Sequence, residues 1–166
     1  MRQTIWPVRW VAKWNATANN WINCMTVNTS LIDVTEKPPS VEEYLRLRRE
    51  GGLSAFSTEA AEIGLKGTLF AVTLRYEHEA IGMGRIVGDG GCFVQIVDIA
   101  VDPHFRGRGL GKLVMTSLMN WAKKELPETA FLSLLADVPA NKLYEKFGFT
   151  ETAPASLGMS CRIAKT

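Results

Sequence analysis

The chain has 166 residues, of which 46% are hydrophobic and 22% charged, so it fits one globular domain rather than a disordered polymer. Its formal charge of +2 argues against a nucleic-acid partner, and no apolar run approaches the roughly 18–20 residues that a membrane-spanning helix needs. Three separated cysteines (Cys24, Cys92, Cys161) and two histidines predict no disulfide framework, no metal site and a reducing, cytoplasmic location.

Residues 1–30 differ from the rest of the chain. They carry no acidic residue, and they hold four of the five tryptophans, at Trp6, Trp10, Trp14 and Trp21. Three interpretations remain open: an amphipathic arm that packs on the domain or on a partner, an organelle presequence, or a non-native upstream extension with Met25 as the start of the compact protein. We therefore treat residues 1–30 as an N-terminal extension and residues 31–166 as a single domain.

Two helices are predicted next. Ser40 precedes V-E-E-Y-L-R-L-R-R, and Glu43 follows it by three residues, which is the capping-box pattern of a helix start. Gly51-Gly52 predicts the end of this helix. Ser57 then predicts the start of a shorter helix, T-E-A-A-E-I-G-L, that ends at residues 64–67.

Three strands follow. Residues 68–75 and 80–87 predict a hairpin around residues 76–79, and G-D-G-G at 88–91 predicts the next turn. The run F-V-Q-I-V-D-I-A-V at 93–101 is apolar except at Gln95 and Asp98. That composition is typical of a strand buried on both faces.

The second half predicts a helix, a strand, another helix and two last strands. Residues 109–126 place Leu110, Leu113, Val114, Leu118 and Trp121 on one helical face. A strand is expected at 131–136, a short helix at 139–147, and strands at 149–152 and 159–163. The order of elements predicts one α/β (α+β) domain with a mixed sheet.

The strongest chemical signal is the loop D-P-H-F-R-G-R-G-L-G-K at 102–112, between a buried strand and a long helix. Its alternating glycines allow close backbone approach, and the helix start offers unpaired amides and a positive dipole end. Together with the basic side chains, these features predict an anion site suited to a pyrophosphate. The loop matches neither the nucleotide P-loop nor the dinucleotide fingerprint.

The loop does fit R-x-x-G-x-G from Arg106 to Gly111, and P-A-N-K-L-Y-E-K-F-G-F follows at 139–149. These two motifs, in this order, resemble those of the GCN5-related N-acetyltransferase (GNAT) superfamily. The resemblance extends from about Val41 to Ile163. It implies a mixed central sheet flanked by about four helices, whose fourth and fifth strands splay apart to form a cleft for acetyl-CoA.

The resemblance also implies site residues. Loop amides would hold the pyrophosphate, the end of the buried strand would pair with the pantetheine arm, and Asn141 and Tyr144 would lie near the cofactor. The implied acetyl-CoA-binding residues are Ile99, Ala100, Val101, Arg106, Gly107, Arg108, Gly109, Leu110, Gly111, Lys112, Asn141 and Tyr144.

Two residues are candidate catalysts. The resemblance implies that Tyr144 protonates the leaving thiolate, and a phenol of pKa ~10 can protonate a thiolate whose thiol has a pKa of ~8.5. The acceptor amine must lose a proton, and Asp98 on the buried strand is the first candidate base. The alternative for Asp98 is a structural pairing with a basic group such as Arg85.

We therefore expect an acetyl-CoA-dependent N-acetyltransferase that acts by direct attack in a ternary complex. The expected acceptor is a small-molecule primary amine, either an amino acid or an arylalkylamine. The alternatives are a protein or peptide N-acetyltransferase and a CoA-binding module without turnover. A homodimer is also plausible, because edge strands and tryptophan-rich arms are common association surfaces.

Overall fold

The computed structural model describes residues 31–163. A five-stranded sheet in the order β1-β2-β3-β4-β5 forms its centre. The strands are β1 (Asp33–Thr35), β2 (Thr68–Tyr76), β3 (Glu79–Gly88), β4 (Phe93–Val101) and β5 (Phe131–Leu134). The α-helices are α2 (Val41–Gly51), α3 (Thr58–Lys66), α4 (Leu110–Glu125) and α5 (Asn141–Tyr144), and 3-10 turns follow at Pro103–Phe105 and Glu145–Phe147.

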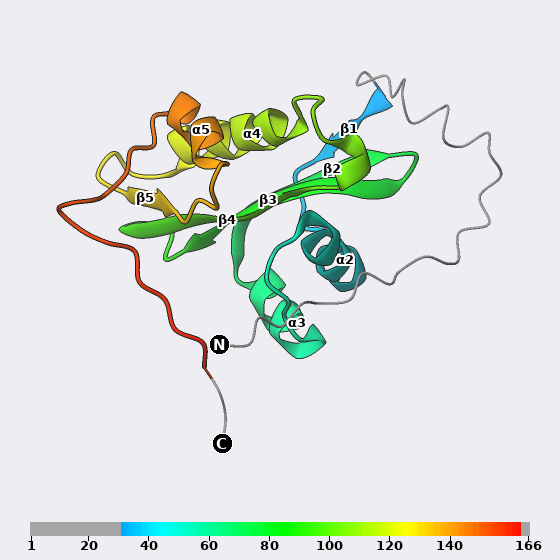
Figure 1. Cartoon of the computed structure of the whole chain (residues 1–166), viewed down its shortest axis with the longest axis horizontal. Helices are drawn as coiled ribbons and strands as arrows, with labels where there is room; N and C mark the ends of the chain where they lie inside the picture. Colours follow the sequence, from blue (N-terminus) through cyan, green and yellow to red (C-terminus); the bar gives the residue numbers. More distant parts are fainter. Residues whose placement is uncertain (1–30, 164–166) are drawn as a thin grey trace, which may run out of the picture.

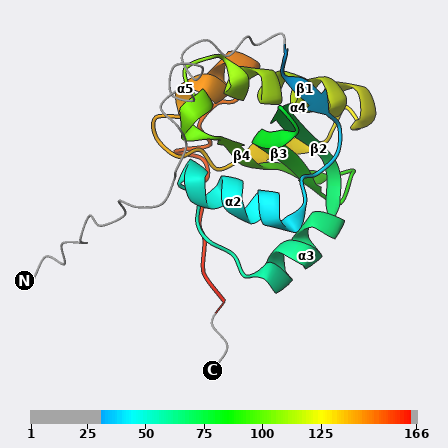
Figure 2. The same ribbon diagram turned by 90° about the vertical axis from the view of Figure 1, so that its right-hand side faces the viewer.

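The sheet is mixed. Strands β1 to β4 pair antiparallel in sequence order, and β4 pairs with β5 in parallel. Helices α4 and α5 cover one face of the sheet, whereas α2 and α3 lie on the other (Figures 1 and 2). This arrangement confirms the mixed α/β sheet with four flanking helices that the resemblance implies, within the described part of the chain.

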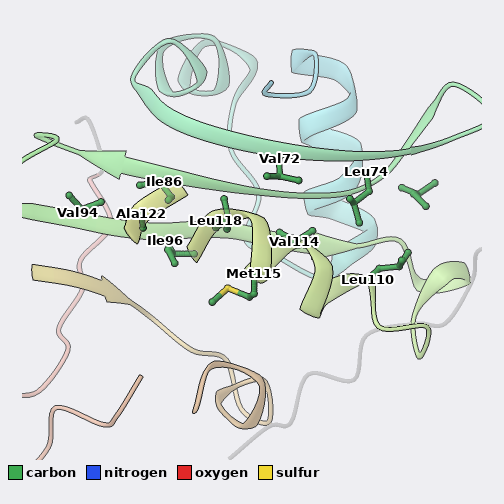
Figure 3. Close-up of a cluster of buried hydrophobic side chains, with 11 residues drawn as sticks. Val72, Leu74, Ile86, Val94, Ile96, Leu110, Val114, Met115, Leu118 and Ala122 are labelled. Atoms are coloured by element: carbon green, nitrogen blue, oxygen red, sulfur yellow. The ribbon is translucent and has the colours of Figure 1, made fainter. Parts of the chain in front are cut away.

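A hydrophobic core fills each side of the sheet. The larger core joins the inner face of α4 to strands β2, β3 and β4 (Figure 3). Its buried members are Val72, Leu74, Ile81, Ile86, Val94, Ile96, Leu110, Val114, Met115, Leu118 and Ala122. The smaller core lies under α2 and consists of Tyr44, Leu47, Ala61, Ala80, Met83 and Ala100. Strand β4 therefore packs on both faces, as its apolar sequence predicts.

The predicted starts of the first two helices are confirmed. The Ser40 side chain accepts a hydrogen bond from the Glu43 amide, and the Glu43 carboxylate accepts one from the Ser40 amide, which completes the capping box. The Ser57 hydroxyl caps α3 by accepting from the Ala60 amide. Gly52 ends α2 in the left-handed region, at a φ of 83°, where a side chain would be strained.

Several boundaries differ from the predicted ones. Strand β1 was not anticipated, because three residues carry too short a pattern to recognise. Strand β5 ends at Leu134 instead of residue 136. The helix expected at 139–147 begins only at Asn141 and tightens into a 3-10 turn at Glu145–Phe147.

The two strands predicted at 149–152 and 159–163 are wrong, since the described residues after β5 contain no strand. The Ser156 amide donates to the Thr152 carbonyl at 3.0 Å and forms a turn instead. Beyond it the segment leads away from the sheet (Figure 1), with Met159 93% and Ile163 86% exposed. The alternating apolar pattern is present, but a strand also needs a neighbour to bond its backbone groups.

The three interpretations of residues 1–30 fall outside the described residues and stay predictions. Between residues 31 and 163, none of the helices is both long and apolar enough to span a bilayer.

Candidate active site

A cavity opens where β4 and β5 separate. The two strands pair from Phe93↔Phe131 to Ile96↔Leu134, after which β5 ends and β4 continues to Val101. The cavity has a volume of about 650 Å³. Its walls come from the end of α2 and the following loop (residues 51–54), from β4 (residues 96–99), and from Arg106, Leu134, Leu135, residues 137–140 and Tyr144. The diverging strands therefore form a cleft with the volume of a ligand-binding site, as the resemblance implies.

A β-bulge accompanies this separation. On β3, Met83 and Arg85 are two residues apart, but their partners on β4, Ala100 and Val97, are three apart. The extra residue lets Asp98 adopt a positive φ of 58°, which is uncommon for a residue with a side chain. At this bulge the Asp98 carboxylate contacts two arginines, Arg48 of α2 and Arg85 of β3.

Asp98 is the centre of a buried charge cluster with Arg48, Arg85 and Tyr44. Its carboxylate pairs with the Arg48 guanidinium through one oxygen and with Arg85 at 2.7 Å through the other. The Tyr44 hydroxyl donates to the same carboxylate at 3.1 Å. The side chains of the aspartate and both arginines are only 7% exposed. Burial and the Asp98 charge together raise the pKa of Tyr44, so its phenol stays protonated as a donor.

The two arginines extend this cluster to the backbone. Arg48 donates to the Ser54 carbonyl at 3.0 and 2.7 Å, which ties the loop after α2 to the sheet. Arg85 donates to the Gly64 carbonyl at 2.9 Å and to the Thr68 hydroxyl at 2.7 Å. The exposed ring of Phe56 covers Arg48, with 4.2 Å between the guanidinium carbon and the ring centroid. The cluster therefore joins α2, α3, β3 and β4 around the cavity.

These contacts favour the structural alternative for Asp98 over the role of base. Both of its oxygens already accept hydrogen bonds from Arg48, Arg85 or Tyr44. The sequence analysis named the Arg85 pairing but missed Arg48. The available signal was the helical spacing of Tyr44 and Arg48, which are one turn apart and so share a face.

The start of α4 forms the predicted amide-lined loop. Gly109 is the N-cap residue, at a φ of 80°, and no side chain caps the helix. The first hydrogen bond of the helix runs from the Leu113 amide to the Gly109 carbonyl at 3.0 Å. The amides of Leu110, Gly111 and Lys112 precede it, where helix geometry provides no carbonyl partner. A methyl group added at Gly107 or Gly109 would meet nothing within 4 Å. The loop therefore offers donors and open space that fit a pyrophosphate.

The basic residues of this loop have different contacts. Arg106 donates to the carbonyls of Val101 at 3.1 Å and Gly51 at 2.9 Å, so it fastens the loop to β4 and to the end of α2. Arg108 donates to the His104 carbonyl at 3.4 Å and lies over the Phe105 ring. Lys112 is exposed on the first turn of α4. Positive charge thus surrounds the amides, although Arg106 also has a structural role.

Of the strand residues that were predicted to bind the cofactor, Ile99 lines the cavity and Ala100 is 4% exposed in the smaller core. The Val101 carbonyl is bonded to Arg106. Such positions would contact a ligand through their backbone, as the resemblance implies, rather than through their side chains.

Tyr144 and Asn141 both belong to α5. Tyr144 lines the main cavity and also a neighbouring one of about 270 Å³, to which Asn141 belongs. The Asn141 amide group donates to the Glu145 carboxylate at 3.1 Å. Burial raises the pKa of the Tyr144 phenol, and the negative charge of Asp137 raises it further. Sequence analysis did not single out Asp137, since a lone aspartate between a strand and a helix carries no distinctive pattern.

Replacing Asp98 should destabilise the fold. Asp98→Asn leaves two buried arginines without their anion, and breaking a buried pair in this way costs about 3–5 kcal/mol. Urea denaturation should show that loss, whereas Glu62→Gln, on the exposed face of α3, should change stability by less than about 0.5 kcal/mol. An Asp98→Asn protein with wild-type stability but no activity would contradict the structural role.

Comparison with known proteins bears on this site. A model of the acetyltransferase (GNAT) family matches residues 34–149. An uncharacterized N-acetyltransferase, ycf52 of Porphyra purpurea, is 28% identical over 102 residues, which is 59% of this chain and 58% of that protein. The chloroplastic GCN5-related N-acetyltransferase 2 of Arabidopsis thaliana is 31% identical over 83 residues, 50% of this chain and 31% of that protein. The matches therefore span less than two thirds of these relatives.

Solved structures are similar over a larger share. A probable acetyltransferase of unknown function from meticillin-resistant Staphylococcus aureus has 46% identity and a TM-score of 0.77, and the match covers 80% of this chain and 99% of that one. The ribosomal-protein-S18-alanine N-acetyltransferase of Escherichia coli shares the fold, with a TM-score of 0.62 at 19% identity over 74% of this chain and 79% of that one. The two sequence motifs lie next to the diverging strands β4 and β5, and the family model matches more than half of the chain. The chain therefore belongs to the acetyltransferase (GNAT) family.

Proposed function

We propose that this protein transfers the acetyl group of acetyl-CoA to the primary amine of a small molecule, by direct attack in a ternary complex. The observation that carries the proposal is the cavity between the diverging strands β4 and β5. Arg106 lines this cavity, and it lies between the 3-10 turn Pro103–Phe105 and the start of α4 with its free amides. A donor held along the loop would therefore extend its reactive end into the cavity.

The residues that would hold acetyl-CoA fit its chemistry. The pyrophosphate would accept hydrogen bonds from the amides of residues 107–112, beside the positive end of α4. The pantetheine arm would run along the part of β4 that β5 leaves unpaired, at residues 97–101. Bound acetyl-CoA supplies an activated acetyl group, whereas the protein supplies position and proton transfer.

Tyr144 is the proposed acid. It lines the cavity, and its raised pKa keeps the phenol protonated at neutral pH. A phenol in that state can give its proton to a departing thiolate. The partly buried surroundings of Tyr144 also limit competition from bulk water.

The acceptor side favours an apolar amine over an amino acid. The exposed side chains of Leu135 and Val138 line the cavity together with Leu53. Arg48 and Arg85, beneath the same wall, are occupied by Asp98 and by backbone carbonyls, so they offer no pairing for a substrate carboxylate. Of the two acceptor classes that the sequence suggests, these contacts support an arylalkylamine.

The homodimer and the cytoplasmic location also stay proposals. Support for a dimer comes from the edge of β5 that pairs with no other strand within residues 31–163, and from the exposed apolar residues Leu157, Met159 and Ile163, which could cover one another between two copies. The location rests on the cysteine usage alone.

An acceptor panel tests the function. Purified protein with acetyl-CoA should release free thiol with arylalkylamines, and more slowly or not at all with amino acids. Apolar side chains line the cavity, and Arg106, the basic residue among its described lining residues, already donates to two backbone carbonyls. Peptides with free N-termini or lysines are included in the same assay. Turnover on peptides alone would identify a protein acetyltransferase, and CoA binding without turnover on any acceptor would identify a binding module.

Removing the Tyr144 hydroxyl should slow catalysis without weakening cofactor binding. Tyr144→Phe keeps the ring and its packing but loses the proton donor, so kcat should fall by about 10²-fold or more. The KM for acetyl-CoA should change little. Steady-state kinetics with the best amine of the panel measures both constants. An unchanged kcat would remove Tyr144 from the proton-transfer step.

A further inference from the structure

Two carboxylates line the main cavity, and they differ in what they contact. Asp98 and Asp137 both belong to its wall. Asp98 is 7% exposed and is bonded to two arginines. Asp137 is exposed, and within residues 31–163 no ion pair or side-chain hydrogen bond involves its carboxylate. A carboxylate that lines a cavity and forms no ion pair is available to bind a cationic ligand.

The backbone fixes Asp137 at this position. It follows β5, and its carbonyl accepts a hydrogen bond from the Ala140 amide at 2.6 Å in the turn that precedes α5. The same turn carries the chain to Tyr144, on the same cavity wall. The negative charge of Asp137 is felt at the Tyr144 phenol, whose pKa it raises. Asp137 and Tyr144 therefore face the same cavity, where Asp137 supplies a negative charge and Tyr144 a proton donor.

We propose that Asp137 is the residue that binds the ammonium group of the acceptor and carries its proton away. This inference rests on the proposed acetyl transfer and adds the acceptor side of the reaction to it. It also replaces Asp98 as the candidate base, because Asp98 is committed to Arg48 and Arg85. It further predicts that the acceptor enters as a cation, since a free alkylammonium has a pKa of ~10.4.

The acceptor nitrogen enters with three protons and leaves as an amide with one. One proton passes to the Asp137 carboxylate and from there to solvent, which the exposed position of Asp137 allows. The nitrogen lone pair then forms the C–N bond with the thioester carbonyl carbon, and the C–S bond breaks. The sulfur takes a proton from Tyr144, and the second nitrogen proton replaces it on the phenolate.

The experiment compares Asp137→Asn and Asp137→Glu with the wild type, using the best amine from the panel. Glu128→Gln is the matched control, because Glu128 is an exposed carboxylate in the loop before β5 and lies outside the cavity. Steady-state constants are measured between about pH 6 and pH 10, a range over which the neutral fraction of the free amine rises by more than about 10³-fold. Urea denaturation checks that all four proteins are folded.

For Asp137→Asn we expect kcat/KM for the amine to fall by about 10²-fold at neutral pH, with the KM for acetyl-CoA unchanged. The difference in kcat/KM between Asp137→Asn and the wild type should shrink as the pH rises. An amine that is already neutral needs no carboxylate to bind its positive charge or to accept its proton. Asp137→Glu should recover part of the loss. Glu128→Gln should match the wild type at every pH.

A second readout does not depend on turnover. Ultraviolet difference titration follows the tyrosine phenols of the unliganded protein. Because the Asp137 charge raises the pKa of Tyr144, Asp137→Asn should lower that pKa, and Asp137→Glu should lower it less. An unshifted phenol in Asp137→Asn would mean that the carboxylate does not face Tyr144, and that would overturn the proposal.

The outcomes separate this inference from the proposed function. If the wild type acetylates an amine and Asp137→Asn does so with the same kcat/KM and pH profile, the role of Asp137 is overturned while acetyl transfer stands. A loss of kcat/KM in Asp137→Asn that is the same at every pH would also overturn the role of Asp137, because it would indicate a structural effect of the substitution. A wild type that acetylates no amine overturns both.

Discussion

The pairing of one buried carboxylate with two buried arginines determines where the cavity of this protein lies. Asp98 sits at a bulge with positive φ, two residues beyond the last contact between β4 and β5. Arg48 and Arg85 hold it from helix α2 and strand β3. An unusual backbone conformation persists only when the surrounding structure fixes it, and these ion pairs do so. The diverging end of β4 and the loop after α2 are thereby held at the two sides of one cavity.

This arrangement gives the two cavity carboxylates different roles. Asp98 stabilises the strand geometry, and its charge is balanced before any substrate arrives. Asp137, which lines the same cavity, has no such partner among the described residues and remains available. Tyr144 lies on the Asp137 side, where both burial and that charge favour its neutral form. The proposed donor site consists of backbone amides, whereas the proposed acceptor site consists of side chains, which is why the acceptor is the harder partner to identify.

Much of the fold could be predicted because local signals were strong. The capping box at Ser40, the glycines after α2 and the amphipathic pattern of α4 each specify an element with little help from tertiary contacts. The loop before α4 could be predicted for the same reason, since backbone donors depend on glycine spacing and on a helix start.

What could not be predicted depends on contacts between distant residues. The strands expected at 149–152 and 159–163 have a suitable pattern but no neighbouring strand. The bulge at Asp98 follows from the register of β3 against β4, and the Arg48 contact spans 50 positions in sequence. Asp137 shows the same limit, because its place beside Tyr144 appears only once the turn after β5 is folded.

Central to the proposed function is the loop at the start of α4, as the proposed binding site of a CoA thioester. Isothermal titration calorimetry of the folded protein with CoA tests this most directly, together with Gly111→Asp and Gly111→Ala, because a side chain at this position meets only Leu143 at 3.5 Å. We expect saturable binding at one site, retained largely in Gly111→Ala and lost in Gly111→Asp, whose carboxylate would repel the pyrophosphate. No saturable heat for the wild type at millimolar CoA, or equal binding by Gly111→Asp, would contradict it.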